Sequence, residues 1–155
     1  MNTEHKQISI FNPFYNEYIE VDEGISELLG VLWLLRIETS LSCEENKPGI
    51  VWIVFSSMDD YQRFLNTLAN VDYGFYLNEI ESSENWSASI WPWNLSEKID
   101  EDKGEIVPTG PPEILCSVSV RFPKEMYPRI LAMLKTFPVC GLLAGEIERL
   151  KESRG

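Results

Sequence analysis

The sequence predicts an α+β domain of the two-layer sandwich type, ferredoxin-like or related, in which an antiparallel or mixed sheet carries helices on one face. Three observations predict this class. Apolar residues at helical spacing alternate along the chain with short runs of β-branched and aromatic residues. A strand-then-helix pattern occurs twice in similar register. The length of 155 residues suffices for one compact domain and is short for two, so we treat residues 1–155 as a single domain.

The N-terminal part is predicted to form an extended segment followed by a helix. Residues 1–7 are polar, and we expect a frayed tail there. The segment Ile8–Ile19 is rich in aromatic residues around an Asn-Pro pair, which favours a short strand or an extended arm. Asp22 is a suitable helix N-cap. From there apolar residues recur at helical spacing as far as Arg36, whose charge suits a last helical turn.

A β-hairpin and a second helix are predicted next. Ile37–Cys43 and Ile50–Phe55 are both rich in β-branched and aromatic residues. The polar run between them contains a Pro-Gly pair, which is typical of a turn. Asp59 or Asp60 is then the expected N-cap of a helix whose apolar stripe ends at Leu68.

The middle of the chain is predicted to hold two strands and a long loop. Residues 72–80 and the segment Trp86–Trp93 have the composition of strands. Residues 96–112 combine an acidic run with several Pro and Gly residues. We expect them to form a long acidic, Pro-rich loop, the best candidate for disorder in the chain.

The C-terminal part repeats the strand-then-helix order of residues 50–68. Ile114–Phe122 alternates as a strand, and a helix is expected to follow and to end near Phe137. A last helix is predicted over residues 140–153. The repeat suggests an internal duplication, and the alternative is that any strand-helix unit looks similar. The predicted core consists of the apolar residues at the repeating positions: Ile25, Leu28, Leu32, Ile53, Phe55, Phe64, Leu68, Val118, Val120, Leu131 and Leu134.

Composition excludes several classes of partner. The formal net charge is −12, which makes nucleic acid and anionic membranes unsuitable partners because both require a positive surface. The apolar run Val31–Leu35 is far shorter than the roughly 20 residues of a membrane span. The three cysteines are odd in number and widely separated. Together with the absence of a signal-peptide core, they favour a reducing, cytoplasmic location.

The usual patterns of catalytic, metal and cofactor sites are missing from the sequence. His5 is the only histidine, and no group of cysteine and histidine residues has the spacing of a zinc site. The acidic run of residues 100–105 does not fit a calcium-binding loop, because aligning its glycine puts Gly110 where the loop needs a glutamate. No Gly-rich phosphate loop occurs. We therefore expect no catalytic, metal or cofactor residues and favour a non-enzymatic role.

The most distinctive local motif is the T-x-x-S-C string formed by Thr39, Ser42 and Cys43. A predicted helix precedes it and a turn and a strand follow it. With this order of elements, about a third of the chain resembles small uncharacterised bacterial and phage α+β proteins that have a helix, the same string and a β-hairpin. The resemblance implies no known activity. A tRNA-modification family has a similar string with a glycine-containing turn after it, whereas Glu44 and Glu45 follow it here.

Cys43 is a candidate reactive thiol. A nucleophilic cysteine needs a base or a positive neighbour that stabilises its thiolate. The adjacent residues are Glu44 and Glu45, which would raise the pKa of the thiol instead. We therefore favour an ordinary, half-buried hairpin cysteine, and the nucleophile stays open as the alternative.

A tryptophan cluster is the other candidate site. Strand alternation places Trp91 and Trp93 on one face and Trp86 on the other. If the first pair is exposed, it is suited to a ligand platform or a partner-binding hot spot, because tryptophan is enriched in both. The alternative is that helices cover one face and the loop of residues 96–112 covers the other.

These observations predict a non-catalytic cytoplasmic protein-interaction module that self-associates. Residues 121–155 carry more basic than acidic side chains, whereas residues 1–120 are strongly acidic. The basic segment could dock on the acidic part of a second copy or of another protein. The alternative is a small-ligand-binding or enzymatic domain with a pocket near Cys43 and the strand Trp86–Trp93. A third hypothesis is an acidic decoy that binds a nucleic-acid-binding protein.

Overall fold

The computed structural model describes residues 5–136 and confirms the α+β class. The predicted last helix, residues 140–153, lies outside the described residues. Along the described chain the elements are β1 (Gln7–Asn12), β2 (Glu17–Asp22), α1 (Glu23–Leu34), β3 (Thr39–Lys47), β4 (Ile50–Phe55), α2 (Met58–Val71), α3 (Tyr73–Phe75), the π-helix η1 (Tyr76–Glu81), β5 (Ser87–Asn94), β6 (Glu97–Asp100), β7 (Glu105–Pro108), β8 (Ile114–Pro123), the 3₁₀ turn η2 (Lys124–Met126) and α4 (Tyr127–Lys135).

The main sheet of residues 5–136 has four strands in the order β3-β4-β8-β5, and every neighbouring pair is antiparallel. Two strands of the main sheet precede each of the helices α2 and α4, so the order of the main-sheet strands and these two helices is ββα followed by ββα. A ferredoxin-like domain has the order βαββαβ instead. That part of the prediction is not confirmed, because each helix here follows a pair of adjacent antiparallel strands.

The two central strands are related by an approximate two-fold axis. Ile53 of β4 lies opposite Val120 of β8. Phe55 lies opposite Val118, and Val51 lies opposite Phe122 at the other end of the same ladder. The predicted repeat equates Phe55 with Phe122, and exchanging the two strands about the central pair brings these residues into equivalent places. Every antiparallel pair has a local two-fold axis of this kind, so the internal duplication stays a prediction.

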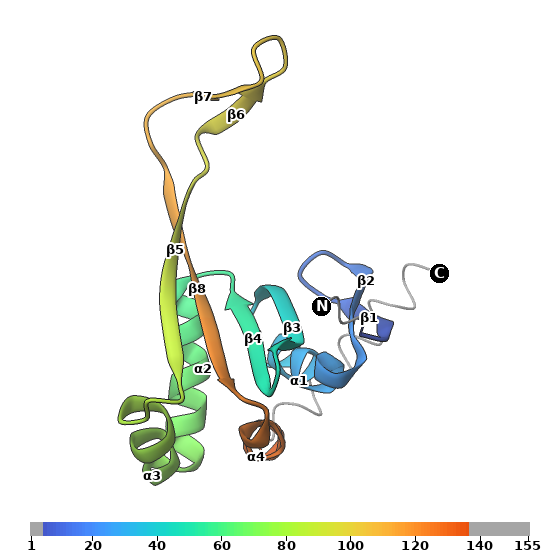
Figure 1. Ribbon diagram of the computed structural model, residues 1–155, viewed down its shortest axis with the longest axis vertical. Coiled ribbons are helices and arrows are strands. Elements are labelled where there is room, and N and C mark those ends of the chain that lie inside the picture. Colours follow the sequence, from blue (N-terminus) through green and yellow to red (C-terminus); the bar gives the residue numbers. More distant parts are fainter. Residues whose placement is uncertain (1–4, 137–155) are drawn as a thin grey trace.

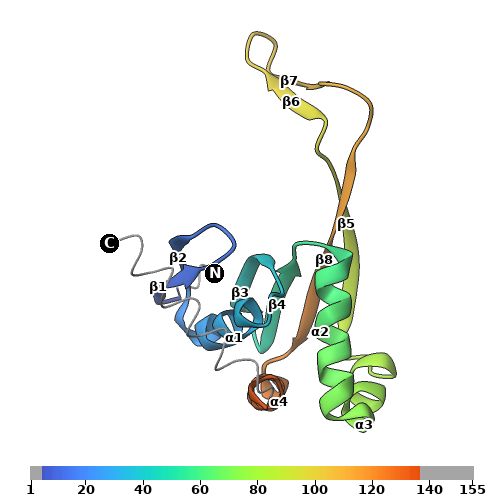
Figure 2. The same cartoon turned by 180° about the vertical axis from the view of Figure 1, so that it is seen from behind.

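The core lies between this sheet and the helices. Figure 2 shows α2 passing across β8 on the side of the sheet where α4 also lies. Ile53, Phe55, Val120 and Phe122 are fully buried there. Of the eleven predicted core residues, Leu131 alone is only partly buried, and the others are buried. No helix among residues 5–136 has the length and apolar character needed to cross a membrane.

The second helix begins two residues earlier than the sequence pattern suggested. Ser57, not Asp59 or Asp60, is the N-cap of α2, and its hydroxyl oxygen accepts a hydrogen bond from the Asp60 backbone N–H at 3.1 Å. The Asp60 carboxylate accepts from the Ser57 hydroxyl at 2.7 Å and from the Glu38 backbone N–H at 2.9 Å. The two side chains thus form a reciprocal cap, and the aspartates favour the positive end of the helix dipole from within the first turn.

The end of the first helix also differs from the prediction. Arg36 lies beyond α1, which ends at Leu34, and has a positive φ of 64°. The guanidinium group of Arg63, on α2, instead donates hydrogen bonds to the backbone carbonyls of Leu35 and Arg36. A cation from another helix therefore satisfies the carbonyl groups that follow α1.

Residues 72–80 were predicted as a strand, and this prediction is wrong. The Asp72 carboxylate accepts a hydrogen bond from the Phe75 backbone N–H at 3.0 Å and caps the short helix α3. The chain continues from there as the π-helix η1, in which Ile80 is buried. Aromatic composition favoured a strand, but the aspartate cap starts a helical turn that burial of Phe75 and Ile80 then stabilises.

Two segments expected to be irregular are ordered in part. Residues 1–4 lie outside the described residues, but Gln7 already belongs to β1. Residues 96–112 contain the antiparallel pair β6–β7. Figure 1 shows that β5 and β8 continue beyond the main sheet as a two-stranded arm, with the β6–β7 hairpin at its end. The sequence of turn residues predicted a loop because neither short strand is apolar enough to give a strand pattern.

We expect Leu32→Ala to lower the free energy of unfolding by about 2–5 kcal/mol, because Leu32 is fully buried beneath the sheet. Urea denaturation measures this change. Leu95→Ala is the matched control, since Leu95 is 56% exposed and its truncation should cost less than about 0.5 kcal/mol. Equal effects of the two substitutions would contradict the placement of α1.

Candidate functional site

The face of the sheet turned away from the helices carries a row of three tryptophan rings. Trp52 comes from β4, and Trp91 and Trp93 come from β5. The ring centroids of Trp52 and Trp91 are 6.1 Å apart, and those of Trp91 and Trp93 are 6.3 Å apart. These distances are within the range of favourable aromatic contacts. We call Trp52, Trp91 and Trp93 the tryptophan row.

Small residues of β8 give the tryptophan row its position. Ser117 lies opposite Trp91 in the ladder, and both Ser117 and Ser119 are almost fully buried. The Trp52 indole N–H donates a hydrogen bond to the Ser119 hydroxyl at 2.8 Å. The Arg121 guanidinium lies 5.7 Å from the centre of the Trp52 ring, a cation–π contact. Trp52 is thus fixed at both ends, because its N–H is bonded and its ring faces a cation.

The outer end of the row lies at the base of the arm. Trp93 pairs with Leu115, whereas the pairing of β4 with β8 ends at Val118. At Trp93 the sheet is therefore only two strands wide. Trp93 is 46% exposed and Leu115 is 38% exposed, so this end of the row presents apolar surface to solvent. Such a patch is a common feature of protein contact sites.

Trp86 does not belong to the row. Its ring stacks on Phe122 at 5.1 Å and on Phe64 at 6.2 Å between centroids. Its indole N–H donates a hydrogen bond to the Tyr61 hydroxyl at 3.0 Å. Alternation correctly placed it on the face opposite Trp91 and Trp93. Trp86 is 9% exposed and serves the core, which removes it from the candidate surface residues.

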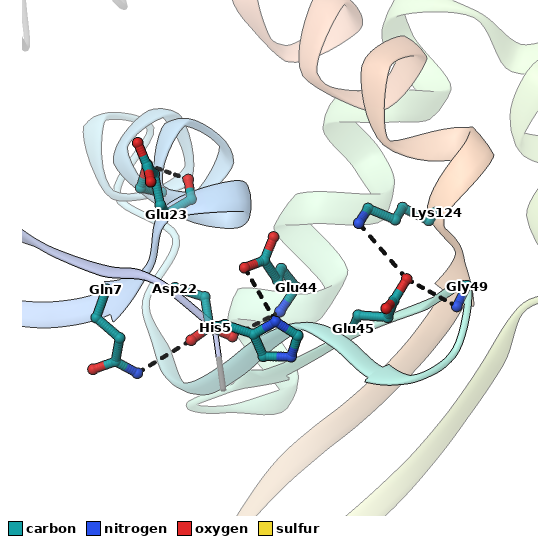
Figure 3. Close-up of polar contacts among 9 residues, drawn as sticks. His5, Gln7, Asp22, Glu23, Glu44, Glu45, Gly49 and Lys124 are labelled. Atoms are coloured by element: carbon teal, nitrogen blue, oxygen red, sulfur yellow. Dashed lines mark hydrogen bonds and ion pairs between the residues drawn. The ribbon is translucent and has the colours of Figure 1, made fainter. Parts of the chain in front are cut away.

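Cys43 lies on β3 opposite Trp52, at the other edge of the sheet from Trp91 and Trp93. A nitrogen of His5, a carboxylate oxygen of Asp22 and the sulfur of Cys43 all lie within 4.8 Å of one another. The Glu44 Oε1 atom is 3.4 Å from His5 Nδ1. We call His5, Asp22, Cys43 and Glu44 the N-terminal cluster, most of which Figure 3 shows in close-up.

The surroundings of Cys43 do not activate its thiol. Burial is the main factor that raises the pKa of the Cys43 thiol, and hydrogen bonding and charge repulsion from Asp22 add to it. The negative charge of Glu44 acts in the same direction, whereas a hydrogen bond with the Glu45 backbone opposes the shift. A raised pKa leaves little thiolate near neutral pH, so the structural interpretation of Cys43 is favoured over an unassisted nucleophile.

Asp22 holds the N-terminal cluster together. It occupies the N-cap position of α1, yet its side chain makes no capping hydrogen bond. Its Oδ1 atom instead accepts from the Gln7 side-chain amide at 3.1 Å, and its Oδ2 atom accepts from the Glu44 backbone N–H at 3.0 Å. Asp22 is 7% exposed, which makes this a buried carboxylate that joins β1, β2 and β3.

The sequence pattern did not identify His5, Trp52 or Arg121 as site residues. His5 was assigned to a frayed tail, although it contacts Glu44. Trp52 and Arg121 were treated as ordinary strand residues, although they extend the tryptophan row across the sheet. Alternation along β4 and β8 assigns each of them a face. It does not say which strands are neighbours, so no local signal could join them to Trp91.

The structure also contains a hollow that the sequence did not indicate. It lies between α2 and the α3–η1 segment and has a volume of about 440 Å³. Its lining includes Tyr61, Tyr73 and Tyr76. Tyr73 and Tyr76 stack with centroids 6.1 Å apart, and burial raises the pKa of the Tyr61 hydroxyl. The hollow borders one end of the predicted strand, since Tyr61 accepts the hydrogen bond from Trp86, but its lining does not include Cys43.

Comparison with known proteins gives one similarity. No family model and no solved structure match the chain. An uncharacterised protein of Acanthamoeba polyphaga mimivirus is 25% identical over 127 residues. The match covers 77% of this chain and 63% of the viral protein, so the chain spans less than two thirds of that relative's length. That viral protein is itself uncharacterised, so the similarity suggests no activity.

We expect Trp86→Ala and Trp93→Ala to differ strongly in their effect on stability. Trp86→Ala should lower the free energy of unfolding by about 3–5 kcal/mol because it empties a stacked core site. Trp93→Ala should change it by less than about 1 kcal/mol, since the ring is 46% exposed. Urea denaturation at low protein concentration measures both values. A core-like loss for Trp93→Ala would contradict its assignment to the surface.

Proposed function

We propose that this protein is a non-catalytic interaction module that self-associates through the tryptophan row. The observation that carries the proposal is the half-exposed apolar end of the row at the base of the arm, where Trp93 and Leu115 face solvent. Tryptophan anchors on an open sheet face are typical of binding hot spots. The helices cover the other face of the sheet. The face that carries the tryptophan row is therefore the one open to a partner.

The arm supplies the reason for choosing a second copy as the partner. A two-stranded ribbon is only marginally stable in water without packing against something else. Beyond Val118 the paired strands β5 and β8 have no third strand beside them, and Ile99 and Ile106 at the end of the arm are more than two-thirds exposed. A two-fold axis across the row would place the arm of each copy along the body of the other and make the contact self-complementary.

Charge supports the same arrangement. Residues 96–112 of the arm carry five acidic and two basic side chains. Residues 121–135 carry four basic and one acidic side chain, and they include Arg121 beside the row. An antiparallel dimer would bring the acidic arm of one copy toward the basic segment of the other. Opposite potentials of this kind favour one orientation and speed association.

The proposed location of this module is the reducing cytoplasm. Cys43 and Cys116, the cysteines of the described residues, are both free. The net charge of −12 makes a protein partner more suitable than nucleic acid, since nucleic acid needs a positive contact surface. Within residues 5–136, Arg121 is the cation found in contact with a ring of the tryptophan row.

The alternative function is small-ligand binding on the same rings. Trp52 is held in place by Ser119 and Arg121, and a fixed aromatic ring is a suitable platform for a planar or sugar-like ligand. The alternative requires a monomer, since a dimer through the row would cover the platform. The oligomeric state therefore distinguishes the two functions.

The central prediction is that Trp91→Ala with Trp93→Ala weakens self-association. Loss of one central anchor commonly reduces affinity about 30-fold, so the double variant should weaken it by at least that factor. Sedimentation equilibrium over a concentration series measures the change. Ile90→Ala is the matched control, because Ile90 lies on the same strand, is 55% exposed and faces the opposite side. A wild type that stays monomeric at high micromolar concentration would contradict the proposal and favour small-ligand binding on the tryptophan rings.

Salt should also weaken the dimer if the acidic arm meets the basic segment. Raising the ionic strength from about 0.01 M to 0.15 M shortens the Debye length from roughly 30 Å to 8 Å. We expect the association constant to fall over this range, and to fall less in a variant with Lys124→Ala and Arg129→Ala. The same sedimentation measurement tests this. An association that strengthens with salt would indicate a purely apolar contact and contradict the proposed orientation.

A further inference from the structure

The N-terminal cluster combines ligand types that rarely meet by chance. His5 lies just before β1, Asp22 ends β2, and Cys43 and Glu44 are on β3. An imidazole nitrogen, a carboxylate oxygen and a thiol sulfur lie within 4.8 Å of one another, and a second carboxylate approaches the imidazole at 3.4 Å. We propose that His5, Asp22, Cys43 and Glu44 bind a divalent transition-metal ion of the zinc type.

The donor set selects the class of metal. Calcium and magnesium bind oxygen ligands, so a site that contains a thiol and an imidazole does not suit them. Zinc binds cysteine sulfur, histidine nitrogen and carboxylate oxygen, in most structural sites with four ligands in a tetrahedron. His5, Asp22 and Cys43 supply three ligands of those types within 4.8 Å of one another, and Glu44, which contacts His5, would supply the fourth. Carboxylate ligands add negative charge, which raises the affinity for a dication.

The spacing of the donor atoms is close to what zinc requires. Zinc–ligand bonds of about 2.0–2.3 Å place the atoms of a tetrahedral site roughly 3.3–3.8 Å apart. The three donor atoms of His5, Asp22 and Cys43 lie within 4.8 Å of one another. The observed upper limit therefore exceeds the tetrahedral spacing by about 1 Å.

Two neighbouring donors orient the Asp22 ligand in advance. The Gln7 amide and the Glu44 backbone N–H each donate to one oxygen of Asp22, which fixes the plane of its carboxylate. Partners of this kind hold metal ligands in position in known sites. They also explain why Asp22 occupies an N-cap position without capping its helix: its oxygens are directed to β1 and β3 instead.

Gly24 leaves the space that Glu44 occupies. A Cβ atom at Gly24 would collide with the Glu44 carboxylate. Gly30 of the same helix has nothing within 4 Å of the corresponding position. The glycine therefore admits the carboxylate to the start of α1, close to His5.

Charge balance provides an independent argument. Asp22 and Glu44 bring two carboxylates to one site with side chains that are largely buried, and Cys43 offers a third acidic group. His5 is the one basic side chain in contact with these groups among the described interactions. A dication would neutralise the carboxylates and displace the thiol proton to solvent as its sulfur binds.

Glu45 provides a natural contrast to Glu44. Its carboxylate accepts a hydrogen bond from the Gly49 backbone N–H at 3.1 Å and lies 3.7 Å from the Lys124 ammonium group. Figure 3 shows the Glu45 side chain directed toward Gly49 and Lys124, whereas Glu44 is directed toward His5. Glu44 therefore approaches a proposed metal ligand and Glu45 does not, which makes Glu45 a suitable control position.

Titration of the full chain with Zn²⁺ against a chromophoric chelator tests the site. We expect one tightly bound ion per chain, and Cys43→Ser and Glu44→Gln should each weaken binding by at least about tenfold. Glu45→Gln and Cys116→Ser are the matched controls and should leave the affinity within about twofold of the wild type. Gly24→Ala should weaken binding as Glu44→Gln does, whereas Gly30→Ala should not.

Substitution with Co²⁺ tests directly whether the sulfur of Cys43 binds the metal. Co²⁺ bound to the wild type should show a thiolate-to-metal absorption band in the near ultraviolet, and Cys43→Ser should lack it. His5→Ala serves as a second ligand variant that lies outside the core and leaves folding intact. Absence of Zn²⁺ binding at micromolar concentration would overturn the proposal. Equal binding by the wild type, Cys43→Ser and Glu44→Gln would overturn it too, because it would indicate surface acids alone.

Discussion

The antiparallel pairing of β4 with β8 is the constraint on which the rest of the structure depends. It aligns Ile53 with Val120 and gives both strands one continuous apolar side. The helices pack against that side, since an unpaired apolar strand face in water would be costly. Any shift of the register by one residue would turn the buried residues to solvent and the serines of β8 toward the helices.

The same pairing creates the tryptophan row. The open face of β8 carries the buried serines Ser117 and Ser119, and the hydroxyl of Ser119 accepts a hydrogen bond from the indole of Trp52. Trp52 and Trp91 come from strands on either side of β8. Their contact therefore exists only because β8 lies between β4 and β5. The candidate interface is a consequence of strand order and not of any one segment.

The N-terminal cluster lies at one edge of the sheet, and the tryptophan row runs from Trp52, opposite Cys43, to the other edge. Cys43 belongs to the edge strand β3 and Trp93 to the edge strand β5. The cluster joins the β1–β2 hairpin to β3 through Asp22, so a bound metal ion would add a further tie between these elements. The row faces outward at the base of the arm. The two proposals thus rest on different residues, and failure of either leaves the other standing.

The sequence by itself determined the features that depend on neighbouring residues. The first helix, the hairpin of β3 and β4, the alternation of β8 and nearly all of the core follow from apolar spacing and turn residues, which act locally. Local rules failed at residues 72–80, where the Asp72 cap and the burial of Phe75 outweigh aromatic composition. Only the tertiary structure decided which strands are adjacent, and therefore that Trp52 meets Trp91 and that His5 meets Cys43. These pairs are separated by 39 and 38 positions, and contacts over such distances arise from packing of the whole core, which no local pattern records.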